Sequence, residues 1–203
     1  IKIWSDDNFI IEDGLAKINY DCKPSLISIV KDVRKQDFKG PLLLRFPHIT
    51  EKQINTLYNT FNASIREYDY KGSFNAVFPL KVNQLPNFIH PLINCGKIFN
   101  YGLEAGSKAE LVIAMTYNNI GAPITVNGFK DKEMIHLCFI AKNMGHNITI
   151  IIEGLNELEM IIEVLNETKL VCPNIGLRVR LHSGGSGMWA KSGGINSKFG
   201  LTS

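Results

Sequence analysis

From about residue 41 onward, short apolar runs alternate with longer segments whose apolar residues recur at helical spacing. The apolar runs predict strands, and the segments between them predict helices. The expected strands cover 41–46, 74–80, 97–103, 122–126, 147–153 and 175–181. The expected helices cover 50–67, 87–94, 107–117, 131–143 and 157–166.

The N-terminal part of the chain has a different pattern. Two apolar runs, 9–12 and 15–18, flank Asp13-Gly14, a pair that is typical of the tight turn in a β-hairpin. A proline then opens the segment 24–35, whose apolar residues fall on one helical face. This part of the chain therefore predicts a hairpin followed by a helix.

Continuous apolar strands that alternate with helices predict a parallel sheet covered by helices. An open doubly wound sheet is the alternative, but no Gly-x-Gly-x-x-Gly turn follows the first strand. The regular spacing favours an α/β fold of the (β/α)8 TIM-barrel type, incomplete here at about six βα units. We expect an isolated piece of this kind to associate through its two open sheet edges.

Composition narrows the class of protein. The chain has 203 residues, of which 45% are hydrophobic and 20% charged, so a packed core is expected. The net charge of +3 is too small to indicate a nucleic-acid partner. No stretch is long enough to span a membrane, and the first residues do not form a signal peptide.

The cysteines indicate the cellular compartment of the protein, and the first residue indicates where the chain starts. Four cysteines lie far apart in the sequence, which argues against a zinc site or a disulfide framework and fits the reducing cytoplasm. The chain starts at Ile1 rather than at a methionine, which we interpret as a start inside a longer gene product.

Polar residues stand at or just after the ends of successive predicted strands. They are Lys81, Glu104, Asn127 and Glu153, and His182 follows the last strand. In barrels of this kind the active site is built at that rim. Each residue alone fits ordinary loop chemistry, whereas their joint placement indicates a site.

Lys81 ends an apolar strand, a position from which its side chain points into the pocket that the sheet forms. Partial burial lowers the pKa of an amine and makes it a nucleophile toward aldehydes. The alternative is a lysine that extends its amine to water. For Lys81 considered alone, this alternative is the stronger one.

The last predicted strand carries two arginines. Ile175, Leu177 and Val179 alternate with Arg178 and Arg180, so we expect the aliphatic face to pack on helices and the arginines to face the barrel interior. Buried guanidinium groups need anionic or hydrogen-bonded partners. Carboxylates and the oxygens of a bound cofactor are both candidates; we favour a cofactor for Arg178 and a carboxylate for Arg180.

Two glycine-rich runs, 183–187 and 192–194, follow this strand. Such a loop can bind phosphate through its backbone N–H groups. A loop that only covers the site or connects two elements is the stronger alternative, because no helix clearly begins after the glycines.

Five stretches together resemble the biosynthetic arginine decarboxylases. They are AVFPLKVNQ at 76–84, YGLEAGSKAEL at 101–111, NGFKD at 127–131, LRVRL at 177–181 and SKFGL at 197–201. The resemblance extends over nearly the whole chain and implies a fold-type III, alanine racemase-like enzyme that uses pyridoxal 5′-phosphate. It implies that residues 1–20 join a second β-domain and that 21–203 form part of the barrel.

The resemblance also implies roles for individual residues. Lys81 occupies the position of the lysine that binds the cofactor as an internal aldimine. Glu104 matches an acidic residue close to that lysine and the pyridine ring, and Arg178 matches an arginine near the phenolic oxygen. Lys198 falls where relatives have a lysine associated with the dimer interface. The remaining active-site residues are expected after Ser203.

The implied reaction is the decarboxylation of L-arginine to agmatine and CO2, the first step of a route to putrescine and spermidine. A cytoplasmic homodimer or higher homo-oligomer, with its active site at the subunit interface, is implied as well. Magnesium is a further cofactor of many such enzymes, without a metal site among these residues. The alternatives are a decarboxylase of ornithine, lysine or diaminopimelate and a non-catalytic homologue that binds pyridoxal phosphate.

Overall fold

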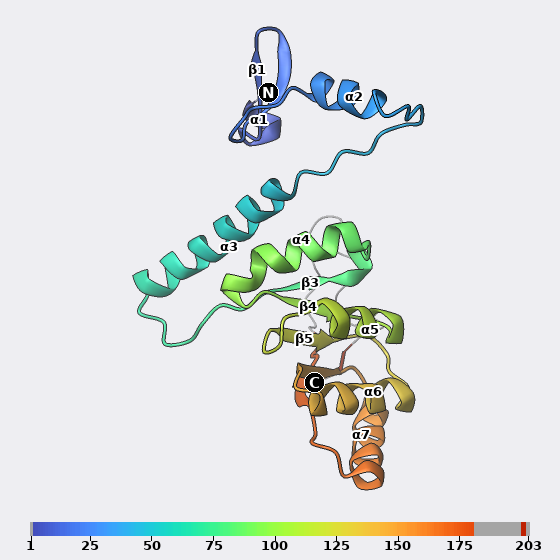
Figure 1. The fold of residues 1–203 in the computed structure, drawn as a ribbon. Coiled ribbons are helices and arrows are strands. Elements are labelled where there is room, and N and C mark those ends of the chain that lie inside the picture. The colour runs from blue at the N-terminus through green and yellow to red at the C-terminus, as the bar shows by residue number, and fades with distance from the viewer. Residues whose placement is uncertain (1, 181–199, 202–203) are drawn as a thin grey trace. The chain divides into compact units, whose positions relative to one another are not determined.

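The computed structural model describes residues 2–180 and 200–201. These fall into two compact units, Ile1–Ile49 and Thr50–Ser203. The first unit contains a short helix, a hairpin and a second helix: α1 (Lys2–Ser5), β1 (Phe9–Glu12), β2 (Leu15–Ile18) and α2 (Leu26–Arg34). Figure 1 shows their order along the chain.

The hairpin forms as its sequence predicts. Strands β1 and β2 pair antiparallel, from Phe9 opposite Ile18 to Glu12 opposite Leu15. Asp13 and Gly14 both have positive φ, at 53° and 71°, as a two-residue turn of this type requires. Helix α2 follows, and its N-cap Ser25 accepts a hydrogen bond from the backbone N–H of Ser28.

The predicted strand at 41–46 is wrong. The structure has no regular element there, and no described strand pairs with this segment. Leu43 is 73% exposed, so the apolar run does not enter a core. A strand needs a hydrogen-bonding neighbour, which an apolar sequence alone does not supply.

The second unit alternates helices and strands. It opens with α3 (Pro47–Glu67), which begins in the first unit, and continues with β3 (Val77–Pro79), α4 (Pro86–Gly96), β4 (Gly102–Ala105) and α5 (Lys108–Tyr117). It ends with β5 (Pro123–Val126), α6 (Lys132–Asn143), β6 (Asn147–Ile152), α7 (Leu155–Thr168) and β7 (Asn174–Leu177). Two short 3₁₀ helices, η1 (Leu80–Val82) and η2 (Lys97–Phe99), follow β3 and α4.

The five strands of this unit form one parallel sheet in the order β3-β4-β5-β6-β7. Spatial order therefore equals chain order, with no reversal among the described strands. A doubly wound sheet has such a reversal, whereas a barrel does not. The barrel interpretation is thus confirmed for this part of the fold, with five described strands instead of six.

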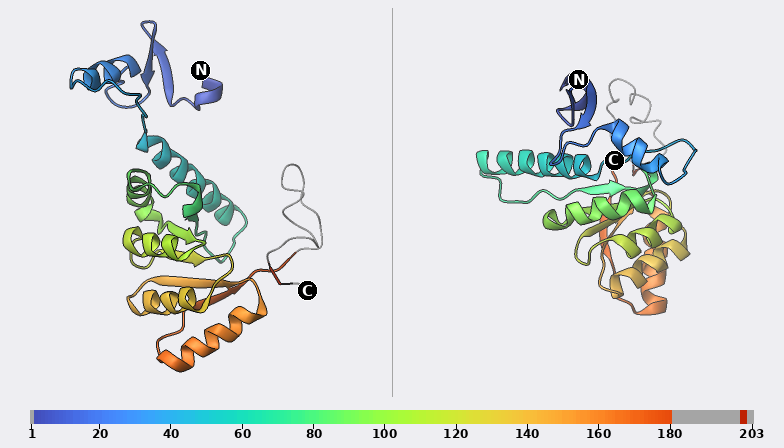
Figure 2. Two further views of the ribbon diagram at one scale, coloured as in Figure 1. Left: turned by 90° about the vertical axis from the view of Figure 1, so that its right-hand side faces the viewer. Right: turned by 45° about the horizontal axis from the view of Figure 1, so that its top comes forward.

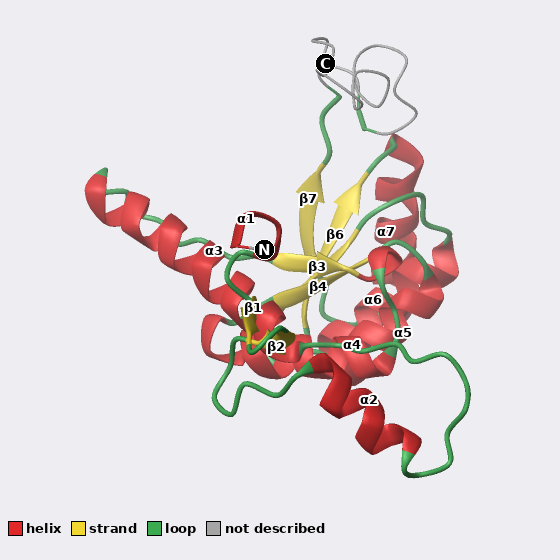
Figure 3. Cartoon of the chain, turned by 90° about the horizontal axis from the view of Figure 1, so that it is seen from above, coloured by secondary structure: helices red, strands yellow, loops and turns green. Residues whose placement is uncertain are grey.

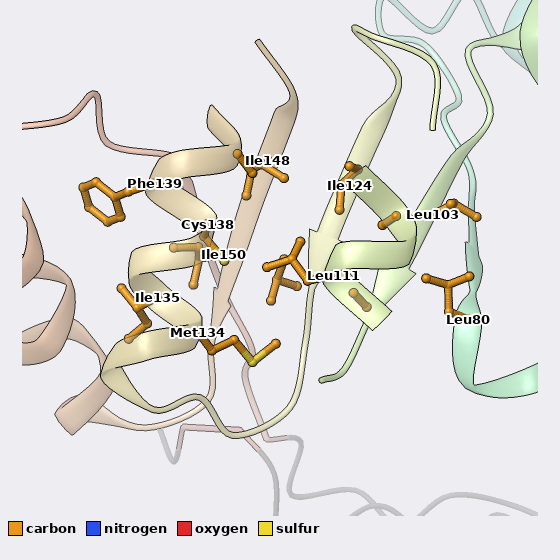
Figure 4. Close-up of a cluster of buried hydrophobic side chains, with 14 of the residues drawn as sticks. Leu80, Leu103, Leu111, Ile124, Met134, Ile135, Cys138, Phe139, Ile148 and Ile150 are labelled. Atoms are coloured by element: carbon orange, nitrogen blue, oxygen red, sulfur yellow. The ribbon is translucent and has the colours of Figure 1, made fainter. Parts of the chain in front are cut away.

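Helices α4 to α7 cover one face of the sheet (Figure 2). Along β4 to β6 the side chains of this face are almost fully buried; they are Leu103, Ala105, Ile124, Val126, Ile148, Ile150 and Ile152. Figure 4 shows several of them beside Ile135, Cys138 and Phe139 of α6. Burial raises the pKa of the Cys138 thiol to about 12, as expected for a core cysteine.

The predicted strand at 97–103 starts too early. Lys97–Phe99 form η2, and Asn100 has a left-handed φ of 57° that ends it. Strand β4 begins only at Gly102, which lies so close to β5 that a Cβ atom would be 1.9 Å from the carbonyl oxygen of Pro123. The glycine therefore permits the close approach of the two strands.

The aliphatic face of β7 also differs from the prediction. Ile175, Leu177 and Val179 are 42%, 64% and 59% exposed instead of packed on helices. In the described part of the chain no helix follows β7, which is the last strand of the sheet (Figure 3). Beyond β7, Val179 forms an isolated parallel bridge to Leu201.

Candidate active site

A cavity of about 720 Å³ opens at the C-terminal ends of the parallel strands. Every strand from β3 to β7 contributes to its wall. The polar side chains in the wall are Lys81, Glu104, Thr125, Asn127 and Arg178. The volume falls within the range of about 300–1,000 Å³ that is typical of small-molecule sites.

Lys81 reaches the cavity because of the short helix that follows β3. Leu80, the first residue of η1, is fully buried in the core. The next side chain, Lys81, lies in the cavity wall and is exposed. The expected pocket position is present, but the residue is exposed, so the described residues do not provide the partial burial that was expected.

Glu104 lies on the inner face of β4, with only 8% of its surface exposed. Its register partners are Pro79 on β3 and Thr125 on β5, both of which line the same cavity. The Thr125 hydroxyl is buried and has no hydrogen-bond partner among the described residues. A buried hydroxyl of this kind can bind a polar group that enters the cavity.

Arg178 lines the opposite side of the cavity, just after β7. Its Nη1 donates to Oε1 and Oε2 of Glu153, at 3.0 and 3.3 Å. The Arg178 side chain is 44% exposed, whereas the Glu153 side chain is fully buried. The expectation of a buried Arg178 guanidinium is therefore wrong, because Arg178 lies in the wall of the cavity, just beyond the last strand of the described sheet.

The strand-end residues thus divide into two groups. Lys81, Glu104, Asn127 and Arg178 meet at the cavity, as the sequence predicts. Glu153 instead holds Arg178 and accepts a hydrogen bond of 2.8 Å from the backbone N–H of Gly128.

Other residues of the sequence analysis lie farther along the chain. The Arg180 side chain donates to the carbonyl oxygen of Gly200 at 3.2 Å. His182, Lys198 and the two glycine-rich runs at 183–187 and 192–194 lie outside the described residues.

Three buried charged residues behind the cavity escaped the sequence analysis: Glu110, Lys130 and Glu157. Glu110 had a detectable signal, because Ser107 and Glu110 have the spacing of a capping box. Ser107 caps α5, and Glu110 Oε2 accepts a hydrogen bond of 2.7 Å from the N–H of Gly106.

The other carboxylate oxygen of Glu110 accepts a hydrogen bond of 3.0 Å from Gln84 Nε2. Glu110 therefore connects the loop after β4 with the segment that follows Lys81.

Comparison with known protein families identifies the family to which this chain belongs. Residues 51–203 match the family described as "Pyridoxal-dependent decarboxylase, pyridoxal binding domain". The chain belongs to this family. The match covers the whole parallel sheet and every wall residue of the cavity.

Individual relatives carry a more specific name. A biosynthetic arginine decarboxylase from Tolumonas auensis is 40% identical over 187 residues, which are 91% of this chain and 29% of the relative. The crystal structure of the biosynthetic arginine decarboxylase SpeA from Campylobacter jejuni is 59% identical, with a TM-score of 0.90, over 100% of this chain and 32% of that protein. The chain thus spans about a third of these relatives.

A diaminopimelate decarboxylase from M. jannaschi shares the fold, with a TM-score of 0.68 and 22% identity over 98% of this chain and 42% of that protein.

The cavity residues fit a pyridoxal group. A primary amine such as that of Lys81 can react with an aldehyde, and a guanidinium group such as that of Arg178 can bind an anionic oxygen. The unpartnered hydroxyl of Thr125 can donate to or accept from the same ligand. Within the described residues no cluster of His, Cys, Asp and Glu is arranged to hold a metal ion.

Proposed function

We propose that this chain forms part of the active site of an arginine decarboxylase, which converts L-arginine to agmatine and CO2 as the first step toward putrescine and spermidine. The observation that carries this proposal is the meeting of Lys81, Glu104 and Arg178 around one cavity at the strand ends. The substrate rests on the names of the relatives, which include the 59% identical structure.

Each residue has a proposed role. Lys81 would hold the cofactor through its amine, which can react with the cofactor aldehyde. Glu104 would place a carboxylate near the pyridine ring, and Arg178 would hold the phenolic oxygen of the cofactor. When bound, the cofactor supplies the electron sink for the pair of electrons that the departing carboxylate leaves behind.

Further properties belong to the same proposal. We expect a homodimer or higher homo-oligomer with the active site at the subunit interface, and assistance by magnesium bound outside the described residues. We also expect residues 1–20 to join a second β-domain. Location in the cytoplasm is supported by four cysteines that are all free thiols. No described helix has both the length and the apolar character needed to cross a membrane.

Two alternatives remain open to experiment: decarboxylation of ornithine, lysine or diaminopimelate, and a homologue that binds the cofactor without turnover. The test measures CO2 release by the complete protein, supplied with pyridoxal phosphate, from each of the four amino acids. Release from arginine well above the other three is expected. Equal turnover of ornithine and arginine would refute the arginine assignment, and cofactor binding without any release would favour the non-catalytic homologue.

A further inference from the structure

A buried ion pair lies directly behind the cavity. Lys130, in the loop after β5, and Glu157, in the first turn of α7, are 5% and 1% exposed. Lys130 Nζ lies 3.3 Å from Glu157 Oε2. Neither residue is part of the cavity wall, so the proposed reaction as described above does not use them.

The polar atoms of the pair bind backbone groups at the strand ends. Lys130 Nζ donates to the carbonyl oxygens of Gly128 and Ile151, each at 2.5 Å, which together with Glu157 uses all three of its hydrogens. Glu157 Oε1 accepts a hydrogen bond of 3.0 Å from the Lys130 N–H. Glu157 Oε2 also accepts one of 2.8 Å from the N–H of Glu153.

These bonds extend to the cavity wall through Glu153. Its backbone N–H is held by Glu157, while its carboxylate accepts from the Gly128 N–H and from Arg178 Nη1. Gly128 is therefore held at both ends, at its N–H by Glu153 and at its carbonyl by Lys130. Gly128 and Arg178 both line the cavity.

Stability alone is a weak reason for such a pair. Burying two charges costs free energy that their attraction often does not recover, and apolar residues of similar volume are frequently as stable. The pair is, in contrast, connected to Arg178, because Glu153 binds both Arg178 Nη1 and Glu157. The Arg178 side chain is 44% exposed, and Arg178 follows the last strand of the described sheet.

We propose that Lys130 and Glu157 are positioning residues that fix Glu153, and through it Arg178, in the orientation that binds an anionic oxygen of the cofactor. This inference rests on the proposed function, because it assumes that Arg178 contacts the cofactor. A charged pair outside the cavity wall thereby controls the orientation of the Arg178 side chain.

The test replaces Glu157 with Gln in the complete protein supplied with pyridoxal phosphate. The variant keeps the shape of the side chain but removes the charge and one of its two acceptor oxygens. We expect weaker cofactor binding, a shifted visible absorption band of the cofactor, and a fall in kcat/KM of about 100-fold, the size that a small misplacement at a catalytic centre can cause.

The control is Glu163→Gln on the same helix. Glu163 also forms an ion pair, with Lys132 at 3.1 Å, but its side chain is 57% exposed. Within the described residues, this pair shares no hydrogen bond with Lys130, Glu153 or Glu157. This variant should bind the cofactor and turn over substrate like the wild type. If Glu157→Gln folds poorly, the double variant Lys130→Met, Glu157→Gln removes both charges and should show the same absorption shift.

A second background separates positioning from general destabilisation. If Glu157 acts through Arg178, Glu157→Gln should cost little further affinity and no further absorption shift in a protein that already carries Arg178→Lys. Equal losses in both backgrounds, or wild-type behaviour of Glu157→Gln, would overturn the inference. Failure of the proposed function is distinguishable, because the wild-type protein would then show no cofactor band or no CO2 release.

Discussion

The close approach of β4 and β5 at Gly102 gives a quantitative prediction for the sheet that carries the site. In Gly102→Ala, the new Cβ would lie 1.9 Å from the carbonyl oxygen of Pro123 and 2.8 Å from its Cγ. A carbon atom normally approaches a carbonyl oxygen no closer than about 3.3 Å. The two strands must therefore separate by on the order of 1 Å.

The loss of stability depends on which atoms have to move to make room for the new Cβ. Overpacking in a core typically costs about 1–3 kcal/mol, and here the obstacle is a backbone atom that cannot change rotamer. We therefore expect a loss of about 3 kcal/mol in the free energy of unfolding. For a domain of about 150–250 residues, a loss of this magnitude corresponds to a decrease in Tm of roughly 6–12 °C.

The assay is thermal unfolding of the complete protein, followed by circular dichroism. Gly106→Ala is the matched control, because a Cβ there would meet only Glu110 Oε2, at an ordinary 3.5 Å. We expect the control to change stability by less than about 0.5 kcal/mol. If Gly102→Ala melted at the wild-type temperature, the packing argument for this strand pair would be refuted.

Two further predictions concern chemistry and pH. Glu104→Ala should retain the fold and lower kcat by about 10²–10³-fold, the size seen for electrostatic catalytic groups. Steady-state kinetics measures this change, and unchanged rates would mean that Glu104 has only a structural role. Burial lowers the pKa of His146, so the folded state disfavours its protonated form and stability should fall as the pH drops through the unfolded value of 6.5. His146→Gln should therefore lose less stability than the wild type between pH 7.5 and 5.5 in urea unfolding; equal losses would contradict the linkage.

Local sequence patterns predicted those elements that carry their own signals. The Asp13-Gly14 turn is an example, since it depends on two residues adjacent in sequence. The segments 41–46 and 97–103 were predicted wrongly, because an apolar run does not reveal whether a partner strand is present or whether a 3₁₀ turn comes first.

The same distinction applies to the site. Lys81, Glu104 and Arg178 could be predicted because the carboxyl ends of parallel strands meet at one edge. The Lys130–Glu157 pair could not, because its members lie 27 residues apart and neither has a local motif that indicates the contact. The partial exposure of Arg178 likewise depends on what covers β7, which its own sequence does not state.

The central claim is that Lys81 is the residue that binds the cofactor. The most direct measurement is borohydride reduction of the complete protein in the presence of pyridoxal phosphate, followed by mass spectrometry of its peptides. We expect the reduced cofactor on the peptide that contains Lys81, and no labelled peptide in Lys81→Ala. An unmodified Lys81, or label on another lysine, would contradict the account.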